Sequence, residues 1–175
     1  MIIDTHTHFY DPFRPQGVPW PSKENKLLYR TVLPEHLKPL AAPEGVTGTV
    51  VVEASRWLED NQWILDLAQN DPFIVGFVSG VVPNQPSFAR ELARFAASPL
   101  FRGIRVSGGF LADVEQGSFL ADMALLAARD LSLDVLMGDP AHFDGLDHIP
   151  IKIIRDLLHN VMLKDHQIRV KGEAK

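Results

Sequence analysis

Two histidines separated by one residue stand near the start of the sequence, in the apolar segment MIIDTHTHFY. A strand turns alternate side chains to opposite faces, so His6 and His8 share a face with Asp4. Two imidazoles so placed can bind one metal ion together, or one ring can position the other beside a substrate. The alternative is two polar residues satisfied at a strand end. The long loop 9–30, rich in proline and aromatic residues, follows the pair and favours a functional site.

Polar side chains also recur on one face of other strand-like segments. In FRGIRVS, Arg105 alternates with Ile104 and Val106, which suit packing under helices. An arginine beside imidazoles is what an anionic or carbonyl-bearing substrate needs. Charges on such a face can also neutralise one another as a structural network. In three predicted strands, the residues that we assign to the polar face are Glu53 and Ser55, then Gly103, Arg105 and Ser107, and finally Asp134.

Segments rich in valine and isoleucine alternate with amphipathic helical stretches along the chain. The predicted strands are 1–8, 46–55, 73–82, 101–107 and 131–137, and the predicted helices are 34–42, 57–70, 86–98 and 118–130. This alternation is typical of a parallel α/β sheet or barrel. The active sites of such barrels lie at the carboxyl ends of the strands, where we expect His6, His8 and Arg105.

The chain has 175 residues, whereas an eight-stranded barrel typically needs about 200 or more. A sixth strand is expected in 149–154 or in 161–163. We therefore predict a single α/β domain over residues 1–175, of the parallel (β/α) TIM-barrel type but incomplete, with about five to six of eight strands. The open edges of such a sheet predict either a homo-oligomer or a chain that is one part of a longer polypeptide.

The composition narrows the classes of partner. The formal charge of −5 and the scattered lysines and arginines argue against nucleic acid. The absence of cysteine excludes disulfides and thiolate metal sites. The first residues lack the pattern of a signal peptide, and no run of about 18 apolar residues occurs. We therefore expect a soluble, cytoplasmic protein that acts on a small molecule and not on a membrane.

Five further histidines follow the first pair. The segment VMLKDH ends an apolar run with His166, as the first strand ends with His8. The remaining four are expected to be surface or capping residues: His36, His142, His148 and His159.

Three segments carry a resemblance to a known family: IIDTHTHFYDP, GVTGTVVVEASRWLEDNQWILDLAQNDPFIVGFVSGVV and SPLFRGIRV. Together they resemble the amidohydrolase superfamily, specifically its amidohydrolase-2 branch of TIM-barrel hydrolases, over about residues 1–140. That branch includes sugar-lactone hydrolases and pyrone-dicarboxylate lactonase, with decarboxylases as more distant relatives. The resemblance implies a hydrolase that opens a lactone, or a related cyclic ester or amide, of a small, anionic or sugar-derived substrate.

The resemblance also implies roles for individual residues. His6 and His8 match the paired histidines of the first strand, as catalytic groups and as ligands of one divalent ion, zinc foremost, although a metal-free site stays open. Arg105 matches an arginine of the fourth strand that lies near the substrate's carboxylate or carbonyl. Ser55 matches a small polar group of the pocket, and Trp20 of the long loop is a further expected substrate contact.

The sixth strand of the family ends in another catalytic histidine. His166 takes that place if VMLKDH is the strand, and His159 lies close to it if IKIIRDLLHNV is; we prefer His166. LDVLMGD lacks the fifth-strand histidine of metal-dependent members, which favours a metal-free lactonase over a metal-dependent decarboxylase.

The aspartate of the family's eighth strand, a metal ligand or general base, is expected beyond residue 175. A truncated, inactive binding or assembly module is therefore a further alternative, and we expect the chain alone to show little or no lactonase activity. An active chain would need another base, for which the candidates are Asp134, Asp139 and Asp165.

Overall fold

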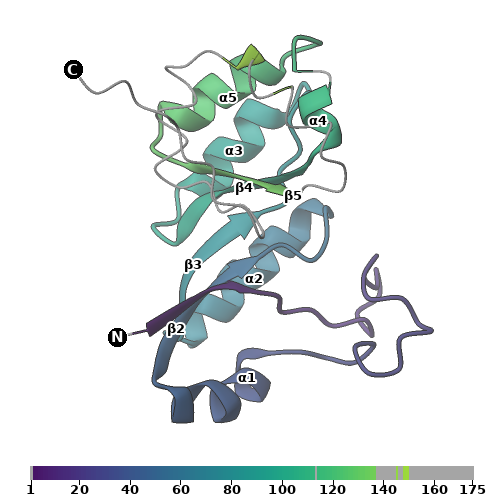
Figure 1. Ribbon diagram of the computed structural model, residues 1–175, viewed down its shortest axis with the longest axis vertical. Helices are drawn as coiled ribbons and strands as arrows, with labels where there is room; N and C mark the ends of the chain where they lie inside the picture. The colour runs from purple at the N-terminus through teal and green to yellow at the C-terminus, as the bar shows by residue number, and fades with distance from the viewer. Residues whose placement is uncertain (1, 113, 137–144, 146–147, 150–175) are drawn as a thin grey trace.

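Five parallel strands form one sheet whose order in space follows their order in the chain (Figure 1). The computed structural model describes residues 2–112, 114–136, 145 and 148–149. The strands are β1 Ile2–Thr7, β2 Val46–Val52, β3 Ile74–Ser79, β4 Phe101–Ser107 and β5 Ser132–Leu136. Every neighbouring pair is parallel, so the carboxyl ends of all five strands lie at one edge of the sheet.

A helix follows each of the first four strands, and α2, α3 and α5 lie on the same side of the sheet (Figure 1). The helices are α1 Pro34–Ala41, α2 Leu58–Asn70, α3 Phe88–Ala96, α4 Gly109–Ala112 and α5 Phe119–Ala127, with a 3₁₀ turn at Ala42–Glu44. The 3₁₀ turn and the short α4 are additions to the predicted elements. Among the described residues, no helix is long and apolar enough to cross a bilayer.

The core lies between the sheet and these helices. Phe88, Leu92 and Phe95 of α3 recur at helical spacing on one face and are almost completely buried. Ile104 and Val106 of β4 are buried in the same cluster. The opposite face of β4 is therefore left for Arg105, as the alternation in the sequence predicts.

The arrangement confirms the predicted fold class, because the parallel strands and the covering helices form part of a TIM-barrel-like α/β fold. Within the described residues, β1 and β5 each pair with a single strand. The expected sixth strand falls almost entirely outside the described residues.

Candidate functional site

His6 of β1 and His8, the first residue after this strand, lie side by side, as predicted. The ring centroids of His6 and His8 are 5.1 Å apart, with the planes inclined at 74°. Asp4 pairs with Thr49 and Thr7 with Val51, so three steps along β1 match only two along β2. This irregularity is a bulge around His6, whose backbone N–H is bound by the carboxylate of Asp4 at 3.0 Å.

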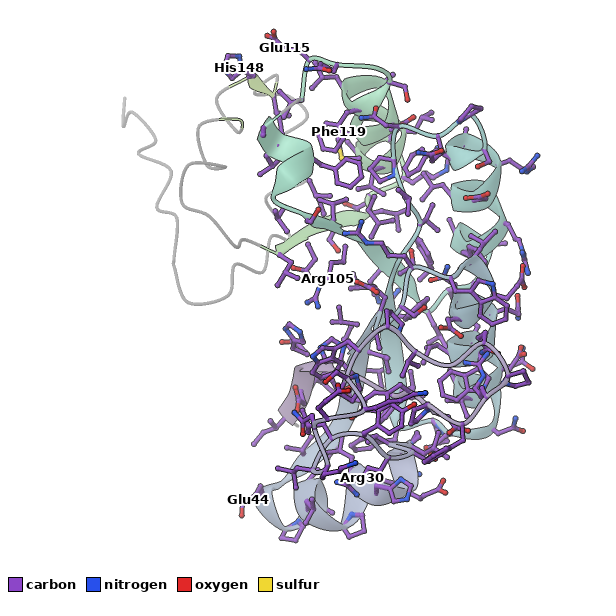
Figure 2. The ribbon with its side chains drawn as sticks, turned by 90° about the vertical axis from the view of Figure 1, so that its right-hand side faces the viewer. Arg30, Glu44, Arg105, Glu115, Phe119 and His148 are labelled. Carbon is purple, nitrogen blue, oxygen red and sulfur yellow. The ribbon has the colours of Figure 1, made fainter. Side chains whose placement is uncertain are left out.

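Arg105 lies beside His6 at the carboxyl end of the sheet. Its Nη2 is 2.9 Å from Nε2 of His6, so the arginine and the imidazole that strand alternation placed on one face are in direct contact. A guanidinium only donates, so the His6 Nε2 is the acceptor of this hydrogen bond. Figure 2 shows Arg105 on the side of the sheet opposite α2, α3 and α5.

Asp134 of β5 holds the arginine in place. Arg105 and Asp134 are directly opposite partners in the β4–β5 ladder. Nε and Nη2 of the guanidinium both contact Oδ2 of Asp134, at 2.8 and 2.6 Å. The two side chains are only 7% and 11% exposed. The strands thus present a positive charge, already paired and ordered, next to an imidazole.

His8 is held in one neutral form. Its Nδ1 is 2.9 Å from the carbonyl oxygen of Val52, and because a carbonyl only accepts, Nδ1 carries the hydrogen and Nε2 is an acceptor. Burial lowers the pKa of the imidazole below its ordinary 6.5, the bond to Val52 opposes this shift, and the nearby Arg105 and His6 lower the pKa further. His8 is therefore a neutral base at neutral pH.

Glu53 follows the end of β2, and its half-buried carboxyl faces the same region. Burial raises the pKa of this carboxyl above 4.5, and the nearby Arg105 and Arg56 oppose the rise. The sequence had placed Glu53 on the polar face without giving it a role in the site. Its shared face with Ser55 was the signal that marked it.

Ser55 and Trp20 take different positions around the site. The buried Oγ of Ser55 accepts a hydrogen bond from the backbone N–H of Trp57 at 3.0 Å, just before α2 begins. The ring of Trp20 is half-exposed and lies 5.6 Å from the ring of His8 and 5.7 Å from that of Tyr10. Trp20 thus lies against His8, whereas the hydroxyl of Ser55 binds the backbone just before a helix.

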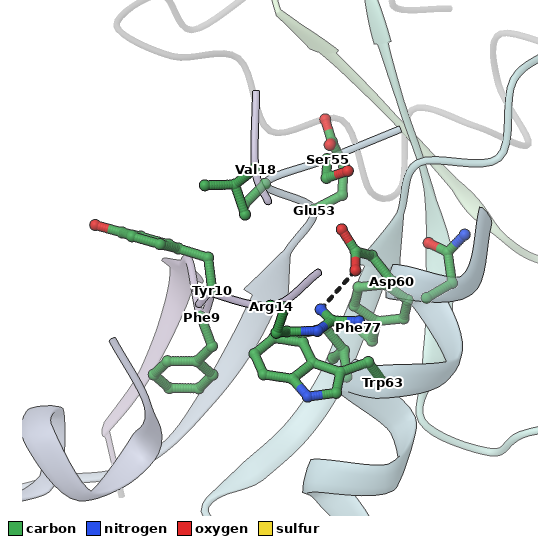
Figure 3. A pocket seen from close by; sticks show the side chains of 12 residues that line it. Phe9, Tyr10, Arg14, Val18, Glu53, Ser55, Asp60, Trp63 and Phe77 are labelled. Carbon is green, nitrogen blue, oxygen red and sulfur yellow. Dashed lines mark hydrogen bonds and ion pairs between the residues drawn. The ribbon is translucent and has the colours of Figure 1, made fainter. Parts of the chain in front are cut away.

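A hollow of about 300 Å³, including its open side, lies between the start of the long loop, the end of β2 and α2 (Figure 3). Glu53 and Ser55 line it from the segment that follows β2, and Arg14 and Val18 line it from the loop. Arg14 forms an ion pair with Asp60 of α2 across this hollow, with Nη1 2.6 Å from Oδ1. The sequence gave no sign of this pair, since its members lie 46 residues apart.

The described residues do not by themselves fit a divalent metal ion. Nε2 of His6, the atom directed at Arg105, already accepts a hydrogen bond from a cation. Within the described part of the chain, no three side chains of histidine, aspartate or glutamate are grouped as metal ligands. A metal at His6 and His8 would need His6 to exchange its guanidinium partner and would need ligands from other residues.

Of the other histidines and aspartates named from the sequence, two lie among the described residues and the rest lie outside them. His36 is a capping residue, as expected, because its Nδ1 accepts from the backbone N–H of Leu33 at the start of α1. His148 lies on the surface with a side chain 57% exposed. The remaining predictions lie outside the described residues: His142, His159, His166, Asp139 and Asp165.

A family profile and two lactonases match most of the chain. The sequence profile of the Amidohydrolase family, Amidohydro_2, matches residues 3–168. An L-fucono-1,5-lactonase of Burkholderia ambifaria is 33% identical over an alignment of 150 residues, which covers 82% of this chain and 50% of that protein. An L-fucono-1,5-lactonase of Burkholderia multivorans is 29% identical over an alignment of 141 residues, which covers 78% of this chain and 47% of the relative.

Solved structures share the fold. An amidohydrolase of Burkholderia multivorans with bound zinc superposes with a TM-score of 0.68 at 27% identity, covering 77% of this chain and 48% of the other. A probable 2-pyrone-4,6-dicarboxylic acid hydrolase of Acinetobacter baumannii, solved with citric acid, gives a TM-score of 0.59 at 16% identity, covering 76% and 48%, and shows the fold alone. The chain spans about half the length of these relatives.

Proposed function

The chain belongs to the amidohydrolase family, and we propose that its site takes part in the hydrolysis of a lactone of a small, anionic or sugar-derived molecule. Similarity to two L-fucono-1,5-lactonases supports this choice of reaction. The observation that carries the proposal is the contact between the paired, buried guanidinium of Arg105 and the imidazole of His6 at the carboxyl end of the sheet.

Opening a lactone requires a group that stabilises the negative charge developing on the carbonyl oxygen and a base that accepts a proton from water. In the proposed reaction, the water oxygen bonds to the carbonyl carbon and the ring C–O bond breaks. The water proton passes through a base to the departing alkoxide, which leaves a hydroxy acid. Arg105 supplies the positive charge at the carbonyl oxygen, and the neutral Nε2 of His8 orients the attacking water.

The base is the part of the mechanism that the described residues leave open. Asp134 is committed to Arg105 through two contacts to one oxygen, so it is a poor candidate. The half-buried Glu53 lies in the same region and is a better one. The family resemblance instead puts the base on an eighth strand, and for that reason we expect little turnover from the 175 residues alone.

The test separates binding from turnover. Purified chain is titrated with L-fucono-1,5-lactone in a calorimeter, and hydrolysis is followed with a pH indicator, with added Zn²⁺ and with EDTA. We expect the wild-type chain to bind the lactone and Arg105→Met to lose that binding. In any longer form that turns over, Arg105→Met should lower kcat/KM about 10²-fold or more. Arg94→Gln, an exposed arginine on α3, is the matched control.

Binding and hydrolysis, each measured with and without Zn²⁺, separate the alternatives. Binding without hydrolysis, in every metal condition, is the expected result and would mean that the 175 residues bind the lactone but lack a working base. Hydrolysis that requires Zn²⁺ would show that His6 leaves Arg105 for the metal. A wild-type chain that binds no sugar lactone, or an Arg105→Met variant that binds as well as wild type, would contradict the proposal.

A further inference from the structure

The long loop between β1 and α1 is closed at its base. Backbone N–H groups of Tyr10 and Val32 each donate to the carbonyl oxygen of the other, at 3.0 and 2.9 Å. The phenol of Tyr10 also donates to the carbonyl oxygen of Leu28 at 2.9 Å. Both ends of the loop are therefore fixed side by side, and its course beyond them depends on contacts made by residues further along.

Arg14 makes the contact that ties this loop to α2. Its guanidinium is paired with Asp60 at 2.6 Å and lies over the ring of Trp63, 4.4 Å from the centroid (Figure 3). The side chains of Arg14 and Asp60 are 18% and 12% exposed. A planar guanidinium can stack on an aromatic face and pair with a carboxylate at the same time, which a lysine cannot do equally well.

The residues that follow Arg14 connect it to Trp20, which contacts His8. The N–H of Gly17 donates to the carbonyl oxygen of Arg14 at 2.8 Å, and the φ of +64° at Gly17 suits glycine. Val18 lines the same hollow as Arg14. Two residues later, the ring of Trp20 lies against the rings of His8 and Tyr10.

We propose that Arg14 is a positioning residue: paired with Asp60 and stacked on Trp63, it fixes the turn at Gly17 and thereby holds Trp20 against His8. The loop is then a preformed wall of the site. That this wall contacts a lactone rests on the proposed function, but the positioning itself does not. Loss of Arg14 should release residues 11–20 while β4 and β5, which carry Arg105, stay ordered.

The experiment measures the loop directly. Amide hydrogen exchange of wild type, Arg14→Gln and Asp60→Asn is followed by mass spectrometry, together with ¹⁹F spectra of chain labelled with 5-fluorotryptophan. The Trp20 resonance is assigned with Trp20→Phe. Arg94→Gln is the matched control, because Arg94 also pairs with a carboxylate of α2, that of Glu59, but on the exposed surface and away from the loop.

In Arg14→Gln and Asp60→Asn, we expect the amides of peptides within residues 11–20 to exchange at least about ten-fold faster than in wild type. Peptides of β4 and β5 should match wild type. The Trp20 resonance should also shift, which distinguishes positioning from a merely local change at Trp57 and Trp63. Arg14→Lys, which keeps the charge without the planar stack, should give a smaller increase confined to the loop and serves if the glutamine variant does not fold.

Wild-type exchange in residues 11–20 and an unmoved Trp20 resonance in Arg14→Gln would overturn the proposal, as would an equal effect in Arg94→Gln. If the wild-type chain binds no lactone while the loop effects are observed, the proposed function fails and the positioning role of Arg14 stands. If the chain binds lactone, Arg14→Gln should weaken binding and, in any active form, raise KM more than it lowers kcat.

Discussion

Two arginine–aspartate pairs, both with a closest contact of 2.6 Å, are carried by different kinds of element. Arg105 and Asp134 lie opposite one another on neighbouring strands, whereas Arg14 and Asp60 join a loop to a helix. The strand pair is fixed by the ladder that surrounds it, so its charge can serve the site. The loop pair has no such ladder, and in the proposal above its own attraction fixes the loop beyond the base that Tyr10 and Val32 close. In the first pair the backbone positions the two side chains, whereas in the second pair the two side chains position the backbone.

The largest expected effect comes from breaking the strand pair. Arg105→Met leaves the buried carboxylate of Asp134 without its partner, so we expect the free energy of unfolding to fall by about 3–5 kcal/mol. Chemical denaturation measures this loss. The double variant Arg105→Met with Asp134→Leu removes both charges and should recover most of the stability.

The double variant should nevertheless fail to bind lactone, because the positive charge at the site is gone. If it were as unstable as the single variant, the cost would not come from the unpaired carboxylate. If it bound lactone normally, Arg105 would have only a structural role.

The next effect comes from the backbone that sets the strand pair. A Cβ at Gly103 would overlap with the carbonyl oxygen and side chain of Ser132, its partner on β5. Gly103→Ala must therefore shift β4 against β5 and should destabilise the protein by about 1–3 kcal/mol. Gly109→Ala is the control, because its Cβ would meet only Oγ of Ser107 at 3.9 Å.

Hydrogen exchange should show the change of Gly103→Ala in β4 and β5 and leave residues 11–20 as in wild type. That result would keep the two pairs independent. Faster exchange in the loop as well would mean that the strand pair and the loop pair belong to one cooperative unit.

The strand pair was partly predictable from sequence, and the loop pair was not. Alternation along β1 and β4 placed His6, His8 and Arg105 on one face, because a strand has a fixed period of two. The bulge around His6 depends on how β1 pairs with β2, which the sequence of β1 does not encode. Arg14 and Asp60 meet only through the course of a loop without periodicity.

A smaller effect is expected in the pH dependence of stability. The folded pKa of His8 lies below its ordinary 6.5, so between these two values the unfolded chain binds more protons. Stability from this group is fully present above about pH 6.5 and is lost as the pH falls through that window. His8→Gln should flatten this part of the curve, measured by denaturation between pH 7.5 and 5.

The same curve sharpens the contrast between the two arginines. Arg105 is among the groups that lower the pKa of His8, and Arg14 is not. Burial is the first cause of the lowered pKa, and the ring of Trp20 lies against His8. Because Arg14→Gln should release Trp20, the His8 window should narrow toward pH 6.5 in this variant, and an unchanged window would mean that Trp20 contributes little to the burial of the imidazole.

The smallest effect is expected at a third pair, which shows what burial adds. Arg94 and Glu59 form two short contacts, at 2.8 and 2.9 Å, yet their side chains are 43% and 47% exposed. Water and salt screen such a pair, and ordering two long side chains opposes it.

Arg94→Gln should therefore change the free energy of unfolding little at low salt and not measurably at about 1 M salt. Arg14→Gln should lower the free energy of unfolding both at low salt and in the same high salt, because Arg14 and Asp60 are largely buried. A salt-resistant loss in Arg94→Gln as large as that in Arg14→Gln would show that contact geometry, and not burial, decides what these pairs contribute.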